Sequence, residues 1–209
     1  MFVISNVPAA EPVILVLGDS LSAAYGIERS RGWVALLQNR LQQAGYPHRV
    51  VNASISGDTT AGGLSRLPQA LAQFQPDILI IELGGNDGLR GLGNRQTRDH
   101  LDQMITLARA ARSRPLLLGM MLPPNFGKAF TEKFLQIYRD LAEQRRVPLV
   151  PFFLEGVADR PDWMQGDGIH PNASGQPLML EHVWAQLQPL LDEEVAGGMG
   201  SAHSPTILK

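Results

Sequence analysis

Two segments near opposite ends of the chain contain residue types that together perform nucleophilic catalysis. Ser20 directly follows Asp19, and Asp167 precedes His170 by three positions. A serine hydroxyl is a poor nucleophile until a neighbouring base takes its proton, and a carboxylate that orients the imidazole makes that base more effective. We therefore predict Ser20 as the nucleophile, His170 as the base and Asp167 as its orienting carboxylate, although each segment alone would more often be an ordinary turn.

Two further segments supply uncharged hydrogen-bond donors. Gly57 lies in a loop of small residues, and because glycine lacks a Cβ its amide can approach a ligand closely. Asn86 offers two side-chain N–H donors without a net charge. Such donors suit the oxyanion that forms when a serine attacks a carbonyl carbon. We expect an oxyanion hole made of the backbone N–H groups of Ser20 and Gly57 and the side chain of Asn86.

The hydrophobic pattern predicts the elements that must bring these segments together. Short apolar runs alternate with amphipathic stretches, which favours right-handed βαβ units and an α/β fold, a three-layer α/β/α sandwich around a five-stranded parallel sheet. We expect strands over 13–17, 49–53, 77–83, 116–118 and 147–150, and helices over 33–44, 64–73, 97–111, 128–145 and 173–191. Each candidate segment other than that of His170 follows a predicted strand, and loops at the carboxyl ends of parallel strands line the working crevice.

The loop over 120–127, after the fourth predicted strand, combines flexible thioether side chains with an aromatic ring. We expect part of it to line a groove for an apolar acyl chain, because such side chains adapt to flexible ligands. The residues that we assign to this groove are Met121, Leu122, Pro123 and Phe126. Packing of the methionines into the core is the alternative.

Composition narrows the possible partners. The 209 residues include 18 Lys and Arg against 20 Asp and Glu, a net charge of −2, and no cysteine. This charge gives no basic field for nucleic acid or an anionic membrane, and no run approaches the ~20 apolar residues of a membrane span. We expect one domain over 13–191, an extension or signal remnant over 1–12 and a flexible tail over 192–209. Because side chains and amides fill every catalytic role, we expect no metal and no organic cofactor.

Four blocks of the sequence resemble those of the GDSL, or SGNH, hydrolases, whose Ser, Gly, Asn and His correspond here to Ser20, Gly57, Asn86 and His170. The blocks are Gly18-Asp19-Ser20-Leu21, Gly57, Gly84-Gly85-Asn86-Asp87 and Asp167-Gly168-Ile169-His170-Pro171. The resemblance covers about 13–191 and is strongest to the bacterial multifunctional thioesterase, protease and lysophospholipase (arylesterase) branch. It implies a flavodoxin-like strand order, hydrolysis of small acyl esters, thioesters and lysophospholipids through an acyl-enzyme, and a periplasmic or secreted enzyme. The first ten residues lack the pattern of a complete secretory signal, so a cytoplasmic location is the alternative.

Other functions fit parts of the same pattern. A carbohydrate acetylesterase or an acyltransferase would use the same residues, since fold and triad do not determine the acyl donor or acceptor. A flavin- or nucleotide-binding module would suit the fold, but the sequence has neither G-x-G-x-x-G nor G-x-x-x-x-G-K-[ST]. A catalytically silent binding protein would have no need for the complete set of catalytic residue types.

Overall fold

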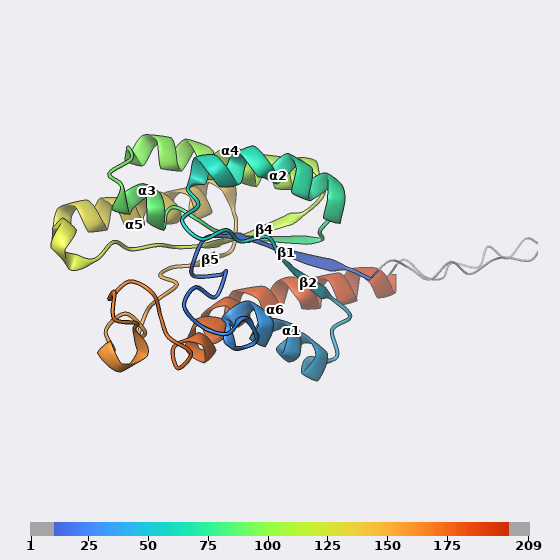
Figure 1. The fold of residues 1–209 in the computed structure, drawn as a ribbon. Coiled ribbons are helices and arrows are strands. Elements are labelled where there is room, and N and C mark those ends of the chain that lie inside the picture. The colour runs from blue at the N-terminus through green and yellow to red at the C-terminus, as the bar shows by residue number, and fades with distance from the viewer. Residues whose placement is uncertain (1–10, 201–209) are drawn as a thin grey trace, which may run out of the picture.

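A five-stranded parallel sheet forms the centre of the computed structural model, which describes residues 11–200 (Figure 1). The strands are β1 (Val13–Gly18), β2 (Arg49–Asn52), β3 (Ile78–Glu82), β4 (Arg114–Leu118) and β5 (Leu149–Val150). Their order in the sheet is β2-β1-β3-β4-β5, and each neighbouring pair is parallel. The predicted α/β class, the parallel sheet and its flavodoxin-like order are confirmed.

Helices cover both faces of the sheet and complete the three layers. They are α1 (Trp33–Ala44), α2 (Thr60–Phe74), α3 (Gly85–Leu89), α4 (Asn94–Ala110), α5 (Lys128–Arg145) and α6 (Gln176–Gly200), with short 3-10 helices at Arg29–Arg31, Pro124–Phe126 and Pro161–Trp163. In Figure 1, α2, α4 and α5 lie on one face of the sheet, and α1 and α6 lie on the other. Within residues 11–200, no helix combines the length and the apolar character that crossing a membrane requires.

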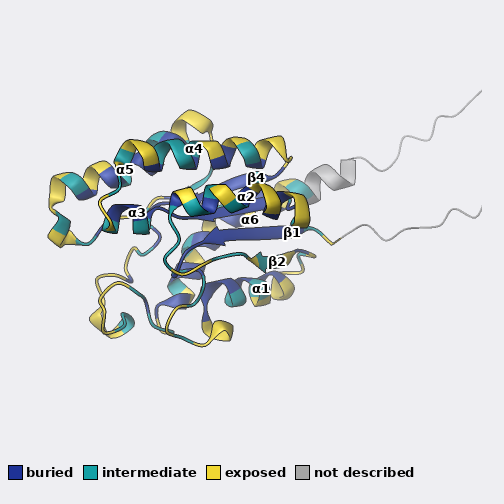
Figure 2. Ribbon diagram, turned by 45° about the horizontal axis from the view of Figure 1, so that its top comes forward, coloured by how far each residue is buried: buried dark blue, intermediate teal, exposed yellow. Residues whose placement is uncertain are grey.

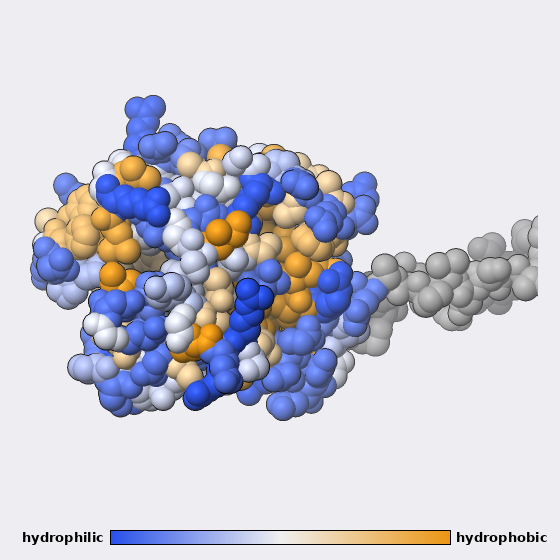
Figure 3. All heavy atoms as spheres, in the orientation of Figure 1, coloured by the Kyte–Doolittle hydropathy of each residue, from blue (hydrophilic) through white to orange (hydrophobic). Residues whose placement is uncertain are grey.

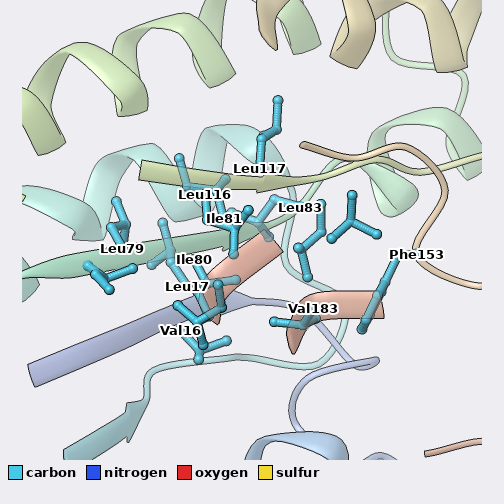
Figure 4. Close-up of a cluster of buried hydrophobic side chains, with 14 of the residues drawn as sticks. Val16, Leu17, Leu79, Ile80, Ile81, Leu83, Leu116, Leu117, Phe153 and Val183 are labelled. Atoms are coloured by element: carbon cyan, nitrogen blue, oxygen red, sulfur yellow. The ribbon is translucent and has the colours of Figure 1, made fainter. Parts of the chain in front are cut away.

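The central strands β1 and β3 are apolar apart from Glu82 at the end of β3, as expected of strands that helices cover on both sides. All residues of β1 and β3 are buried, and the sheet is dark blue in Figure 2 while exposed residues follow the outer faces of the helices. Figure 4 shows side chains of β1, β3 and β4 packed together, with Val183 of α6 and Phe153 beside them. This single core fixes the positions at which the strands end, and therefore where the loops between them begin.

Several helix boundaries differ from the sequence-based expectation. Helix α2 begins at Thr60 rather than at 64, because the Thr59 side chain accepts the N–H of Gly62 and caps the helix before its two glycines. The short helix α3 occupies a segment that we expected to be a loop.

The last helix also differs from its predicted range, since it begins at Gln176 instead of 173 and continues to Gly200 instead of ending at 191. Residues 192–200, expected to belong to a flexible tail, are therefore helical. Side chains at the start of this extension bind the body of the protein: Asp192 accepts from Tyr46, and Glu194 lies 2.7 Å from Nε2 of His48. The remaining parts of the expected extension and tail, residues 1–10 and 201–209, lie outside the described residues.

The strand order reverses between β1 and β3, because the chain passes from β1 outward to β2 and then returns across β1 to β3. In open parallel sheets, ligands bind in the crevice beyond the carboxyl ends of the strands at this reversal. Ser20 follows β1 and Asn86 follows β3, so the two residues lie on either side of that point.

Candidate active site

The residues predicted for nucleophilic catalysis lie in one chain of hydrogen bonds. Oγ of Ser20 lies 2.8 Å from Nε2 of His170, although 150 positions separate the two residues in the sequence. Nδ1 of the same imidazole lies 2.7 Å from Oδ2 of Asp167. Ser20 is 9% exposed. The structure thus brings together all three residues in the geometry that proton transfer from the serine requires.

The turn that carries His170 also keeps Asp167 ionised. Oδ1 of Asp167 accepts the backbone N–H groups of Ile169 and His170 at 2.9 and 3.0 Å. The hydrogen bond from the His170 N–H is the main reason that the pKa of Asp167 falls to about 2. Because an ionised carboxylate only accepts hydrogen bonds, Nδ1 carries the proton of a neutral His170 imidazole and Nε2 can accept from Ser20.

Asn86 lies beside the nucleophile loop. Its Nδ2 donates a 3.0 Å hydrogen bond to Oδ2 of Asp19, the residue before Ser20. The turn into α3 requires Gly84, which has φ of +115° and whose hypothetical Cβ would lie 2.1 Å from the Tyr138 hydroxyl oxygen. The end of β3 therefore holds the Asn86 amide against the loop that follows β1.

Gly57 lies in the loop after β2, the strand next to β1. The N–H of Ile55 donates to the Gly18 carbonyl at 3.0 Å, which ties this loop to the end of β1. The carbonyl of Gly57 accepts Nη2 of Arg90 at 2.7 Å, and its φ of +79° lies in the region that favours glycine. The loop is thus fixed at the same edge of the sheet as Ser20 and Asn86.

A pair of buried carboxyl groups lies directly behind the nucleophile, and the sequence interpretation did not assign it a role. Oε2 of Glu82 accepts the Asp19 N–H at 3.1 Å and the Ser22 hydroxyl at 2.6 Å. Burial raises the pKa of Asp19 to about 6. The pKa of Glu82 is also raised well above its ordinary value, because the side chain is fully buried and the Asp19 charge lies close to it. A carboxyl group at the end of the otherwise apolar run 78–83 was the sequence signal for this pair.

Arg66 of α2 is a second residue that the sequence interpretation missed. Its guanidinium donates to Asp58 Oδ2 at 2.8 Å, to the Ala53 carbonyl, and to the Gly18 carbonyl at 3.3 Å. It therefore joins the loop after β2 to the end of β1. The signal was available, since Arg66 is the one charged residue between Asp58 and Asp77.

The structure separates the residues that we assigned to an acyl groove. Met121 is 40% exposed, and Phe126, partly exposed, stacks on Phe130. Leu122 is only 2% exposed and packs in the core beside Gly88, so we leave it out of the proposed groove. Side chains alternate in direction along an extended segment, so exposure of Met121 places its neighbour inside.

Two hollows lie near the ends of β1 and β2. A shallow one is lined by Ser20, Leu21, Ala24, Tyr25, His170, Pro171 and Gln176. The larger, of about 370 Å³, lies between α1 and the loops after β1 and β2 and does not include Ser20 or His170 in its lining. Neither lining includes loop 120–127. In Figure 3, apolar residues on the face shown there form several separate groups among polar ones.

Known proteins resemble this chain in sequence. Residues 16–178 match the GDSL-like lipase/acylhydrolase family. Over 183 residues the chain is 55% identical to Esterase TesA of Pseudomonas aeruginosa, covering 88% of this chain and 91% of that protein. Over 186 residues it is 48% identical to Thioesterase 1/protease 1/lysophospholipase L1 of Escherichia coli (strain K12), covering 89% of this chain and 88% of that protein.

A solved structure shares the architecture. The psychrotrophic esterase EstA from Pseudoalteromonas sp., in a crystal structure inhibited by monoethylphosphonate, superimposes with a TM-score of 0.81. It is 37% identical, and the match covers 86% of this chain and 98% of that one. The chain therefore belongs to the GDSL-like lipase/acylhydrolase family.

Proposed function

We propose that this protein hydrolyses carboxylic esters and acyl thioesters through an acyl-enzyme intermediate on Ser20. The observation that carries the proposal is the unbroken series from Ser20 Oγ to His170 Nε2 at 2.8 Å and from His170 Nδ1 to Asp167 Oδ2 at 2.7 Å. A nucleophile, a base within hydrogen-bond reach and a group that orients the base are the minimum set for acyl transfer to a hydroxyl.

In the first half of the reaction, Ser20 Oγ attacks the acyl carbon while His170 Nε2 takes the hydroxyl proton. The carbonyl π electrons move onto oxygen, and the resulting oxyanion needs hydrogen-bond donors. We assign this role to the N–H groups of Ser20 and Gly57 and to the Asn86 amide, because their loops meet at the same edge of the sheet. The protonated imidazole then donates its Nε2 proton to the departing alcohol or thiol, which leaves the acyl group on Ser20.

In the second half, a water molecule takes the place of the leaving group. His170 Nε2 removes a proton from the water as it attacks the acyl carbon, and the same proton returns to Ser20 Oγ when the acid departs. Asp167 remains ionised throughout, because its folded pKa is about 2, and it stabilises the imidazolium formed in each half-reaction.

We propose acyl chains of apolar character as the preferred substrates, including those of lysophospholipids. The relatives named above are an esterase and a thioesterase with lysophospholipase activity in its name. The exposed thioether of Met121, with Pro123 and Phe126 in the same loop, supplies apolar surface at the carboxyl edge of the sheet. From the family resemblance we further propose a periplasmic or secreted location, which fractionation of the producing cell tests.

Labelling with a fluorophosphonate tests the proposed function. The intact protein should form a covalent adduct that mass spectrometry locates on the peptide containing Ser20, and it should release p-nitrophenol from p-nitrophenyl esters and free thiol from acyl-CoA. Ser20→Ala should abolish the adduct and both activities, while Ser65→Ala, at an exposed position of α2, should leave them unchanged. A wild-type protein that forms no adduct at Ser20 contradicts the proposal. Acyl transfer to an added alcohol in preference to water would identify a transferase instead.

A further inference from the structure

The contact between Ser20 and His170 exists for only part of the proposed reaction. It joins loops that are 150 positions apart, and it depends on the hydroxyl proton of Ser20. Once Ser20 carries an acyl group, its oxygen has no proton to donate. During hydrolysis of the acyl-enzyme, other contacts between the two loops must therefore hold the imidazole in place.

Gln165 makes such a contact. Its Nε2 donates to the Tyr25 carbonyl at 2.8 Å and to the Pro171 carbonyl at 3.1 Å. Its backbone N–H donates to the carbonyl of His170 at 2.8 Å. One side-chain amide thus binds the loop of the nucleophile and the loop of the base, and both of its N–H groups are used.

Tyr25 makes the second contact. The centroid of its ring lies 4.5 Å from that of the His170 imidazole, with the planes tilted by 42°. Its N–H donates to the Ser20 carbonyl at 3.2 Å, so the ring moves with the nucleophile. Half of the Tyr25 residue is exposed. The ring therefore packs against the imidazole from the nucleophile loop.

The loop that follows Ser20 has a left-handed residue on either side of Tyr25. Ala24 has φ of +60°, a conformation that is unfavourable for a non-glycine residue and persists only where surrounding contacts hold it. Gly26 has φ of +72°, and a Cβ there would lie 2.0 Å from Oε1 of Gln165.

We propose that Gln165 and Tyr25 are positioning residues that hold the His170 imidazole beside Ser20 while the acyl-enzyme is hydrolysed. The inference depends on the proposed function. Its consequence is a difference between the two half-reactions. In acylation the Ser20–His170 hydrogen bond itself helps to position the base, whereas in deacylation Gln165 and Tyr25 provide the contacts to the nucleophile loop. Loss of either contact should slow deacylation more than acylation.

The variant Gln165→Glu tests this difference with little change in shape, because it removes both side-chain donors and places carboxylate oxygen against two carbonyl groups. Stopped-flow measurement of p-nitrophenol release from p-nitrophenyl butyrate separates an initial burst from steady turnover. We expect a burst approaching one equivalent per enzyme and a steady rate reduced about 10- to 100-fold, the effect of misplacing a catalytic group by about 1 Å. The rate of fluorophosphonate labelling of Ser20, which reports attack by the serine without deacylation, should change less than about threefold.

Three further variants make the result specific. Gln103→Glu, the same change at an exposed position of α4, should alter neither phase. Tyr25→Phe keeps the ring and should retain both phases, whereas Tyr25→Ala should reproduce the selective loss of deacylation. Melting temperatures measured in parallel show whether each variant is folded at the assay temperature.

The outcomes separate this inference from the proposed function. Equal reduction of labelling and turnover in Gln165→Glu and Tyr25→Ala, or no reduction in either, would overturn the positioning role while leaving the proposed function intact. Failure of the wild-type protein itself to label at Ser20 would overturn the proposed function.

Discussion

The side-chain amide of Asn86 donates a 3.0 Å hydrogen bond from Nδ2 to Oδ2 of Asp19, the residue immediately before Ser20. Asp19 is 2% exposed and its Oδ1 accepts the N–H of Leu21, so the carboxyl group cannot turn away without losing both bonds. One N–H of Asn86 is therefore used to fix the orientation of the amide. We propose that the other donates to the oxyanion beside Ser20.

Replacing Asn86 with alanine removes one proposed oxyanion donor. We expect Asn86→Ala to lower kcat for p-nitrophenyl esters by about 10²–10³, the usual effect of losing one such donor, with a smaller effect on KM. Asn39→Ala, at an exposed position of α1, is the matched control. An unchanged kcat in Asn86→Ala would exclude Asn86 from the oxyanion hole.

Ser20→Ala and His170→Ala should nearly abolish turnover. The first removes the atom that forms the acyl-enzyme, and the second removes the base 2.8 Å from it. Because the two residues act as a unit, the double variant should be about as inactive as either single variant. Steady-state kinetics with purified variants measure this. A double variant much less active than both single variants would mean that the two residues act independently.

Asp167 should matter less than Ser20 or His170. Its side chain is 39% exposed, so water can partly replace the carboxylate, and we expect Asp167→Ala to lower kcat less than either of the other changes. Because the pKa of Asp167 is about 2, the carboxylate stays ionised throughout the assay range. Steady-state kinetics of the wild type and Asp167→Ala at about pH 8 measure this loss. A loss of kcat as large as that of His170→Ala would contradict the prediction.

Glu82→Gln should change how stability depends on pH. In the folded protein the pKa of Glu82 lies well above its ordinary value of 4.5. Above pH 4.5 the folded protein therefore binds more protons than the unfolded chain. Stability is then greatest below about pH 4.5 for this group and is lost as pH rises toward the folded pKa, by about 1.4 kcal/mol for each pH unit between the two values. We expect the urea midpoint of Glu82→Gln to fall less than that of the wild type between pH 5 and pH 8. If the urea midpoints of the two proteins changed equally with pH, Glu82 would not have a raised pKa in the folded protein.

Phe126→Ala should alter acyl-chain preference if loop 120–127 lines the acyl groove. Loss of the ring removes apolar surface from the loop that also contains Met121, so kcat/KM should fall for long-chain p-nitrophenyl esters more than for the acetate. Asn125→Ala, at an exposed position of the same loop, is the matched control. Coincident chain-length profiles for Phe126→Ala and the parent would remove this loop from the acyl site.

The fold and the main site residues could be predicted because both depend on local sequence. Runs such as Ile78–Glu82 are apolar enough to be recognised as strands buried on both faces, and their alternation with amphipathic helices fixes the α/β class. The serine, glycine and asparagine stand directly after such strands, where parallel topology collects loops at one edge. Asp167 and His170 could be paired because three positions in a tight turn keep them close.

What the sequence could not decide was how side chains from distant segments meet. Leu122 and Met121 are equally apolar, and only the path of the loop places one inside and the other outside. Helix α3 forms despite its two glycines, and α6 continues past 191, where Asp192 and Glu194 bind Tyr46 and His48. Gln165 has no distinguishing local pattern, because its bond to Tyr25 exists only when loops 140 positions apart in sequence are brought together by the sheet. Local chemistry determined which residues are suited to catalysis, and long-range packing decided which of them touch.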